Sequence, residues 1–200
     1  MNDGLTFHEL SGDALLPWID GLGRLRIAVF REYPYLYDGS LDYEREYLKT
    51  YAKSTRSLVV LVTDAQDEVV GATTCIPLSD EGPEFQEAFI QAGRDVNDVC
   101  YFGESILLPQ FRGRGMGKEF FKRREAHAKK LGFKWTAFCA VDRRAEDTRR
   151  PADYRPLDEF WISQGYTKQP DLKATFVWKE IGDDAESPKT LTFWTKPWTR

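Results

Sequence analysis

A short glycine-rich turn between an apolar segment and a basic helix constrains this chain more than any other feature. Residues 107–121 read LLPQFRGRGMGKEFF, so that a predicted strand ends, glycines alternate, and an amphipathic helix begins. Glycine lacks the Cβ that would keep a ligand away from the main chain. The first N–H groups of a helix have no internal partner, and they lie at the positive end of the helix dipole. The segment therefore predicts a phosphate-binding loop.

The charges around this loop agree with an anionic ligand. Residues 112–134 hold nine Lys or Arg against two Glu, a local net charge of +7, whereas the whole chain carries −4. A cationic island on an acidic protein favours a compact polyanion over a nucleic-acid track, which needs a broad basic face. No pattern of aromatic and basic strand residues accompanies residues 122–130, as RNA binding would require. The alternative for the helix alone is a solvated basic face.

The spacing of the glycines distinguishes between known phosphate loops. A Walker A loop needs Gly-x-x-x-x-Gly-Lys-Ser/Thr, but here Arg112 would replace its first glycine and Glu119 its magnesium-binding hydroxyl. A dinucleotide fingerprint needs Gly-x-Gly-x-x-Gly/Ala, and a large side chain occupies its last position in either register. The remaining pattern is Arg112-x-x-Gly115-x-Gly117.

That pattern resembles the acyl-CoA pyrophosphate loop of the GNAT superfamily of N-acetyltransferases. A second segment, Phe160-Trp161-Ile162-Ser163-Gln164-Gly165-Tyr166, is similar to the helix end and aromatic turn of the same superfamily. The resemblance is specific over residues 99–170 and topological elsewhere. It implies a GNAT-like fold and acetyl-CoA as cosubstrate.

The resemblance also implies which residues bind the cosubstrate. Backbone groups of the strand before the loop would hold the pantetheine arm, and the loop with its cations would hold the pyrophosphate. The residues concerned are Ile106, Leu107, Leu108, Arg112, Gly113, Arg114, Gly115, Met116, Gly117 and Lys118.

Glu104 is the predicted general base. It is the only charged residue in 99–108, and a carboxylate inside an apolar strand loses water and so gains affinity for a proton. Several members of the resembled family place a glutamate on this strand to deprotonate the acceptor amine. The alternative is an edge or bulge position, next to Gly103, at which Glu104 simply faces water.

The general acid departs from the family pattern. Many relatives have a tyrosine where this chain has Trp161, whose indole has no proton that titrates near neutral pH. The role is therefore vacant, unnecessary, or filled by another group, for which we name Tyr154. A packing role for Tyr154 is the alternative.

An aromatic and acidic segment is predicted to line the acceptor pocket, as the corresponding region does in GNAT-like proteins. Aromatic faces and carboxylates suit a cationic amine. The residues are Tyr33, Tyr35, Tyr37 and Asp38, each of which could instead only pack. Tyr43, Tyr47 and Tyr51 recur every four residues, which predicts one core-facing helix stripe.

The hydrophobic pattern predicts one α/β domain over residues 1–200, of α+β type. Seven strands, with helices between some and hairpins between others, indicate a mixed, mostly antiparallel sheet flanked by helices. Strands are expected at 5–10, 58–63, 69–76, 99–108, 133–141, 172–180 and 190–196. Helices are expected at 13–31, after Ser40, and at 83–92, 116–131 and 156–164.

Composition excludes several other classes. No apolar run approaches the ~20 residues that a membrane helix needs, and the start has no secretion signal, so we expect no membrane and a cytoplasmic location. The three cysteines lie far apart in apolar runs, which favours buried reduced thiols. With only two histidines, we expect no metal site.

The sequence therefore predicts an acetyl-CoA-dependent N-acetyltransferase in which a small-molecule or peptide amine attacks the thioester directly. The alternative is a non-catalytic acyl-CoA-binding sensor, and a weaker one is an RNA-associated basic helix. The sequence leaves open the acceptor, the general acid, the oligomeric state (a homodimer is one possibility) and the role of the insertion at 77–98.

Overall fold

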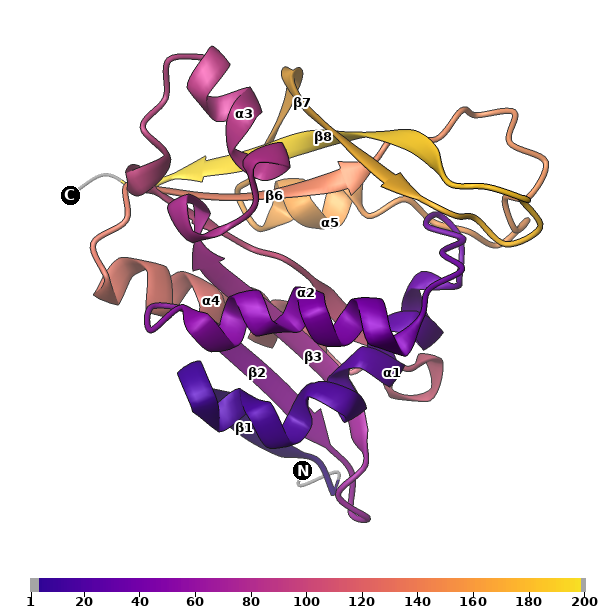
Figure 1. The fold of residues 1–200 in the computed structure, drawn as a ribbon, viewed down its shortest axis with the longest axis horizontal. Helices are drawn as coiled ribbons and strands as arrows, with labels where there is room; N and C mark the ends of the chain where they lie inside the picture. The colour runs from indigo at the N-terminus through magenta and orange to yellow at the C-terminus, as the bar shows by residue number, and fades with distance from the viewer. Residues whose placement is uncertain (1–3, 199–200) are drawn as a thin grey trace.

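A mixed eight-stranded sheet organises residues 4–198, which the computed structural model describes (Figure 1). The strand order is β1-β2-β3-β4-β6-β8-β7, with β5 paired to β3 off this path. All pairings are antiparallel except β4 with β6. The strands are β1 (Thr6–Leu10), β2 (Leu58–Thr63), β3 (Val69–Pro77), β4 (Val99–Tyr101), β5 (Ser105–Leu107), β6 (Trp135–Val141), β7 (Thr167–Trp178) and β8 (Ser187–Pro197).

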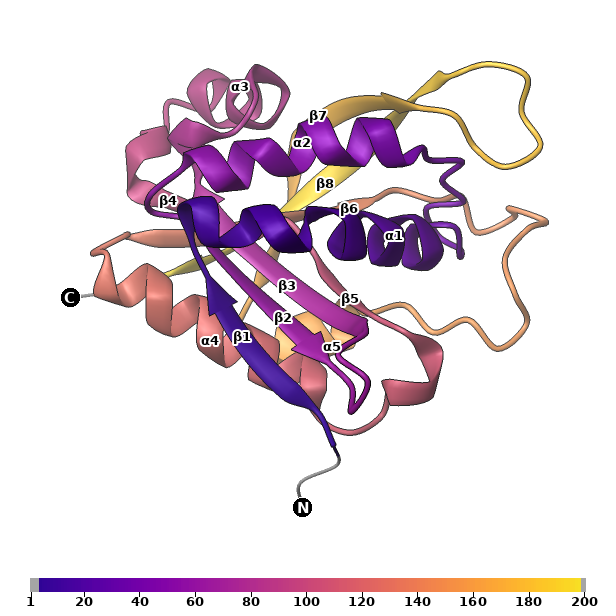
Figure 2. The same ribbon diagram turned by 60° about the horizontal axis from the view of Figure 1, so that its bottom comes forward.

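Helices cover both faces of this sheet. Figure 2 shows α1 and α2 on one face and α4 and α5 on the opposite face. The helices are α1 (Ile19–Phe30), α2 (Leu41–Lys53), α3 (Pro83–Gln91), α4 (Met116–Lys130) and α5 (Asp158–Ser163). Short 3-10 helices lie at Gly12–Trp18, Leu78–Asp80, Val96–Asp98 and Pro109–Phe111. The predicted fold class, a mixed and mostly antiparallel sheet flanked by helices, is confirmed.

The expected single strand over 99–108 is wrong, and its interruption adds the eighth strand. Between the pairs Ile76–Tyr101 and Thr73–Ser105, β3 has two residues and the opposite chain has three. The extra residue produces a β-bulge that bends the strand. At Gly103 a Cβ would lie 2.0 Å from the hydroxyl oxygen of Tyr51, so only glycine fits there.

The bulge separates two neighbouring strands. β4 runs parallel to β6 as far as Tyr101, and the N–H of Phe102 still donates to the carbonyl of Ala137 at 2.7 Å. Beyond that point β5 pairs with β3, and the rest of β6 pairs with β8. The sheet therefore opens between β5 and β6.

Local signals in the sequence explain most of the other boundaries. The hydroxyl of Ser40 accepts from the N–H of Tyr43 at 3.3 Å and caps α2. The hairpin between β2 and β3 and the helix α3 form where they were expected. β7 begins five residues earlier than predicted, because an irregularity between Gln169 and Lys173 interrupts the alternation.

The tyrosine stripe on α2 is only partly core-facing. Tyr51 is buried, Tyr47 is half-buried, and Tyr43 is 59% exposed. Four residues advance the helix by slightly more than one turn, so each successive tyrosine is rotated by about 40°. The stripe therefore runs from the solvent into the core.

Residues 4–198 lack two features that would indicate other functions. None of the helices described is long and apolar enough to cross a bilayer. Over the same residues, no group of three or more His, Cys, Asp or Glu side chains is arranged to hold a metal ion.

Candidate functional site

A cavity of about 1030 Å³ lies at the opening between β5 and β6. Its walls come from the end of α1, the bulge, the glycine loop, β6 and the segment leading into α5. It brings together twelve of the predicted residues: Tyr33, Tyr35, Glu104, Ile106, Leu107, Arg112, Gly113, Gly115, Met116, Gly117, Lys118 and Tyr154. Leu108, Arg114, Tyr37 and Asp38 do not line it.

The glycine loop presents backbone donors to this cavity. Gly113 and Gly115 have φ of 78° and 81°, a conformation that favours glycine. Gly115 immediately precedes α4, and its carbonyl accepts from the N–H groups of Lys118 and Glu119. The N–H groups of Met116 and Gly117 have no backbone acceptor within residues 4–198. Unpaired N–H groups at a helix start are suited to an anionic ligand.

The cations of the loop have their own contacts. The Nε of Arg112 donates to the carbonyl of Leu107 at 2.9 Å, and its Nη1 forms an exposed ion pair with Glu32 at 2.9 Å. Arg114 donates to the carbonyl of Gln110 at 3.1 Å. Glu32 also lines the cavity, so an entering polyanion would compete with it for Arg112.

Glu104 is held in a buried ion-pair cluster. The alternative expectation, that Glu104 faces water, is wrong, because the residue is only 5% exposed. The carboxylate pairs with Arg26, which also pairs with Glu44. The Arg26 guanidinium lies 5.1 Å from the ring centre of Phe30 and 4.5 Å from that of Tyr47. We refer to Arg26, Glu44 and Glu104, one guanidinium between two carboxylates, as the ion-pair triad.

The triad has an excess negative charge and two unused acceptors. Burial disfavours the charge on Arg26, but Glu104 and Glu44 outweigh it and raise the pKa of Arg26 well above its usual value. The three groups together carry a formal charge of −1. One carboxylate oxygen of Glu44 and one of Glu104 (both Oε1) are buried without a hydrogen-bond partner in the described chain. An N–H group or a water molecule would satisfy them.

Two buried arginines, Arg26 and Arg124, escaped the sequence-based prediction. Arg26 follows the core residue Leu25 on α1, and Arg124 lies four residues after Phe120 on α4. Both therefore occupy the apolar face of an amphipathic helix. A cation at such a position is the signal that could have identified them.

Trp161 and Tyr154 both line the cavity. Trp161 packs edge-on against Phe138 and Trp194, with ring centres 5.1 Å apart in each pair. Tyr154 packs edge-on against Tyr33 at 4.7 Å. Burial, and to a lesser degree Tyr33, raises the pKa of Tyr154, which makes it a weaker acid.

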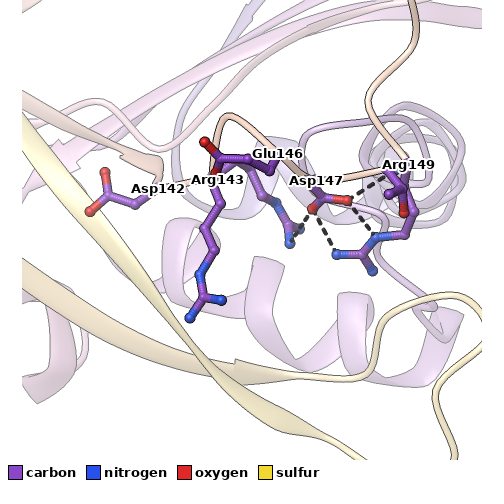
Figure 3. Close-up of a pocket in the computed structure, with 7 residues that line it drawn as sticks. Asp142, Arg143, Glu146, Asp147 and Arg149 are labelled. Atoms are coloured by element: carbon purple, nitrogen blue, oxygen red, sulfur yellow. Dashed lines mark hydrogen bonds and ion pairs between the residues drawn. The ribbon is translucent and has the colours of Figure 1, made fainter.

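A second pocket, of about 550 Å³, lies within the loop that follows β6 (Figure 3). It contains three acidic and three basic side chains, so its formal charge is zero. Asp147 pairs with Arg149 at 2.9 Å and approaches Arg143 at 3.9 Å. The lining residues are Asp142, Arg143, Arg144, Glu146, Asp147, Thr148 and Arg149.

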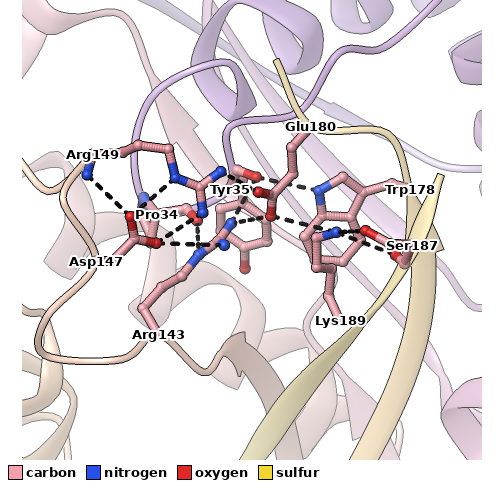
Figure 4. A network of polar contacts seen from close by, with 9 residues as sticks. All are labelled: Pro34, Tyr35, Arg143, Asp147, Arg149, Trp178, Glu180, Ser187 and Lys189. Atoms are coloured by element: carbon pink, nitrogen blue, oxygen red, sulfur yellow. Dashed lines mark hydrogen bonds and ion pairs between the residues drawn. The ribbon is translucent and has the colours of Figure 1, made fainter. Parts of the chain in front are cut away.

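A polar network fixes the aromatic segment against this loop (Figure 4). The carbonyl of Tyr35 accepts from Arg143 at 3.0 Å and from the indole of Trp178 at 3.2 Å. The carboxylate of Glu180 forms an ion pair with Arg143 at 2.7 Å and a second one with Arg149. Three separate parts of the chain therefore position the wall of the cavity that carries Tyr33 and Tyr35.

Tyr37 and Asp38 lie outside the cavity. Tyr37 forms an isolated β-bridge with Glu180, and burial, followed by Glu44, raises the pKa of its hydroxyl. The carboxylate of Asp38 pairs with Lys179 at 3.2 Å. These contacts attach the segment to the end of β7 and direct it away from the opening.

Two further groups, the Cys139 thiol and the Glu81 carboxyl, have raised pKa values. Burial raises the pKa of the Cys139 thiol in the cavity to about 12, so it stays protonated. Burial raises the pKa of Glu81 to about 7, although the Tyr51 hydroxyl donates to it at 3.0 Å. A folded-state pKa above the ordinary 4.5 adds stability that is complete below pH 4.5 and is lost as pH rises through about 7.

Comparison with known proteins identifies one family. The model of the Acetyltransferase (GNAT) family matches residues 24–150, which include the glycine loop but not the aromatic turn at 160–166. No curated protein matches the chain.

Solved structures are similar in fold. A GCN5-related N-acetyltransferase from Kribbella flavida is 18% identical, with 99% of this chain and 100% of that chain covered and a TM-score of 0.57. A ribosomal-protein-alanine N-acetyltransferase from Brucella melitensis is 13% identical, with 96% and 99% covered and a TM-score of 0.59. An acetyltransferase from Thermus thermophilus is 15% identical, with 97% of each chain covered and a TM-score of 0.57.

Proposed function

Since the chain belongs to the acetyltransferase (GNAT) family, we propose that it transfers the acetyl group of acetyl-CoA to a primary amine by direct attack. The observation that carries this proposal is the shape of the cavity. A glycine loop suited to a diphosphate and the buried Glu104 both line the opening between β5 and β6. A thioester carrier lying in this opening would have its anionic part at the loop and its acyl part towards the bulge.

The loop residues would hold the cosubstrate. The free N–H groups of Met116 and Gly117 would bind the pyrophosphate, and Lys118 and Arg112 would neutralise it. Ile106 and Leu107 line the opening, so their main chain would contact the pantetheine arm. Leu108 and Arg114 support the loop from outside the cavity.

Glu104 would act as the general base through its free oxygen. Arg26 binds one carboxylate oxygen and leaves Oε1 without a partner, so Oε1 is the atom able to accept a proton from the amine or from a bridging water. The neutral amine would then attack the thioester carbonyl without an acyl-enzyme. The net negative charge of the triad would also attract the ammonium form of the substrate.

The acceptor would enter beside Tyr33, Tyr35 and Tyr154. Their rings line the cavity on the side of the loop after β6 and offer faces to a cationic amine. Tyr37 and Asp38, predicted from the sequence for the same role, would act indirectly by fixing this segment. Tyr154 also remains the side chain proposed to protonate the leaving group.

A second function, an acyl-CoA sensor without turnover, is favoured by one observation. Trp161 occupies the cavity where many relatives have an acidic tyrosine. Incubating the protein with acetyl-CoA and a panel of amines, and measuring free CoA thiol, separates the two functions. Amine-dependent thiol release supports the enzyme, while binding of CoA without release supports the sensor.

The base assignment needs its own variant. Glu104→Gln keeps the shape of the side chain but cannot take up the proton, so turnover should fall at least about 10²-fold while CoA affinity is retained. Unchanged turnover would exclude Glu104 as the base. If calorimetry detects no CoA binding to the unmodified protein, the whole proposal fails.

A further inference from the structure

The buried side chain of Arg124 lines the same cavity. It is 2% exposed, and no ion pair to it exists within residues 4–198. Its guanidinium lies between two rings, 4.2 Å from the centre of Phe102 and 4.8 Å from that of Phe121. Burial lowers the pKa of Arg124, and the opposing effects of nearby groups, among them Tyr166 and Glu104, only partly offset it.

The contacts of Arg124 do not account for its presence. Its Nη1 donates to the carbonyl of Glu104 at 3.2 Å. That carbonyl already accepts from the hydroxyl of Thr73 at 2.7 Å and from the N–H of Thr74 at 3.1 Å, which occupy its two lone pairs. The Nε of Arg124 is buried without an acceptor among the described residues. An unpaired buried cation is strongly disfavoured, so a negative partner is expected.

The position along α4 indicates which anion that partner is. Arg124 follows the helix start at Gly115 by nine residues, which places it about 13 Å along the helix axis. An extended pantetheine arm separates the diphosphate of CoA from its sulfur by a comparable length. With the diphosphate at the glycine loop, the sulfur would therefore lie near Arg124 and the bulge.

We propose that the guanidinium of Arg124 stabilises the CoA thiolate as it leaves. The inference rests on the proposed function, since it needs CoA in this cavity. It gives the chain an electrostatic substitute for the acidic tyrosine that Trp161 replaces. A thiolate needs either a proton or a nearby cation, and Arg124 supplies the cation.

The overall step converts an ammonium ion and a thioester into an amide, a thiol and one released proton. The ammonium substrate loses one proton, by way of Glu104, and its nitrogen then forms a bond to the thioester carbon. The tetrahedral intermediate breaks its C–S bond, and the electron pair stays on sulfur as a thiolate beside Arg124. The nitrogen loses its second proton as the amide forms. One of these protons finally protonates the thiolate, from solvent or through Tyr154, and the other goes to solvent.

The test measures the ionisation of bound CoA. The ultraviolet absorbance of the thiolate is followed against pH with saturating CoA, and the same protein with desulfo-CoA, which lacks the sulfur, serves as the blank. The thiol of bound CoA should ionise at least about one pH unit below free CoA, as for an acid next to a cation. This comparison needs no variant. A bound thiol that titrates like free CoA would overturn the proposal.

Variants then assign the effect to Arg124. Arg124→Gln should abolish the shift and lower kcat about 10²-fold with little change in KM, whereas Arg124→Lys should keep part of both. Arg123→Gln is the matched control, because Arg123 is on the same helix but pairs with Glu9 and Glu119 outside the cavity. A shift that persists in Arg124→Gln would also overturn the proposal. Failure to bind CoA at all would refute the proposed function instead.

Discussion

Removing Arg26 should destabilise the fold far more than removing any exposed arginine. In Arg26→Met the carboxylates of Glu44 and Glu104 lose their counter-charge while both remain buried. Methionine restores part of the packing against Phe30 and Tyr47, so the main effect is electrostatic. The variant thus isolates the contribution of one cation between two buried anions.

The magnitude follows from the burial of all three groups. Breaking a buried ion pair by removing one partner costs about 3–5 kcal/mol, and here one cation serves two carboxylates, so we expect the upper part of this range. That is a large share of the roughly 5–15 kcal/mol that stabilises a typical domain. The triple variant Arg26→Met, Glu44→Gln, Glu104→Gln should recover most of the loss, since no buried charge remains.

The assay is urea unfolding near neutral pH, with Arg45→Met as the matched control. Arg45 also lies between two carboxylates, Asp20 at 2.8 Å and Asp42 at 3.0 Å, but all three side chains are at least 40% exposed. Water replaces such a partner, so the control should lose far less stability. Equal losses in the two variants would refute the reasoning.

Three further predictions test the backbone and the protonation of the site. Gly115→Ala and Gly132→Ala both place Ala at positive φ with open space around the Cβ, so each should cost about 1 kcal/mol, but only Gly115→Ala should weaken CoA binding in calorimetry. Equal CoA affinities would argue against the loop. Gly103→Ala should lower the free energy of unfolding by about 1–3 kcal/mol, because its Cβ would collide with Tyr51; an unchanged melting temperature would contradict the bulge. Between pH 4.5 and 8 the unmodified protein should lose about 3 kcal/mol of stability as Glu81 ionises, and Glu81→Gln should remove this loss. Stability–pH curves that run parallel for the two proteins would contradict this prediction.

The order of most helices and strands and the glycine turn before α4 were predictable from the sequence because they depend on local interactions. Hydrophobic periodicity identified α1, α2 and α4, and Ser40 marked a helix start through its own side chain. The conformation of Gly115 follows from its lack of a side chain. Such features are encoded within a few residues, so the sequence alone predicts the glycine loop and the family resemblance.

The chemistry of the cavity depended on contacts between distant residues, which only the tertiary structure decided. Arg26 meets Glu44 across 18 residues and Glu104 across 78, so no local pattern connects them. The bulge at Gly103 arises from a mismatch with β3 that cannot be counted until the two strands are aligned. Whether Glu104 faces water or a guanidinium, and whether Arg124 has an anion beside it, are properties of packing, because burial determines how strongly a charge requires a partner.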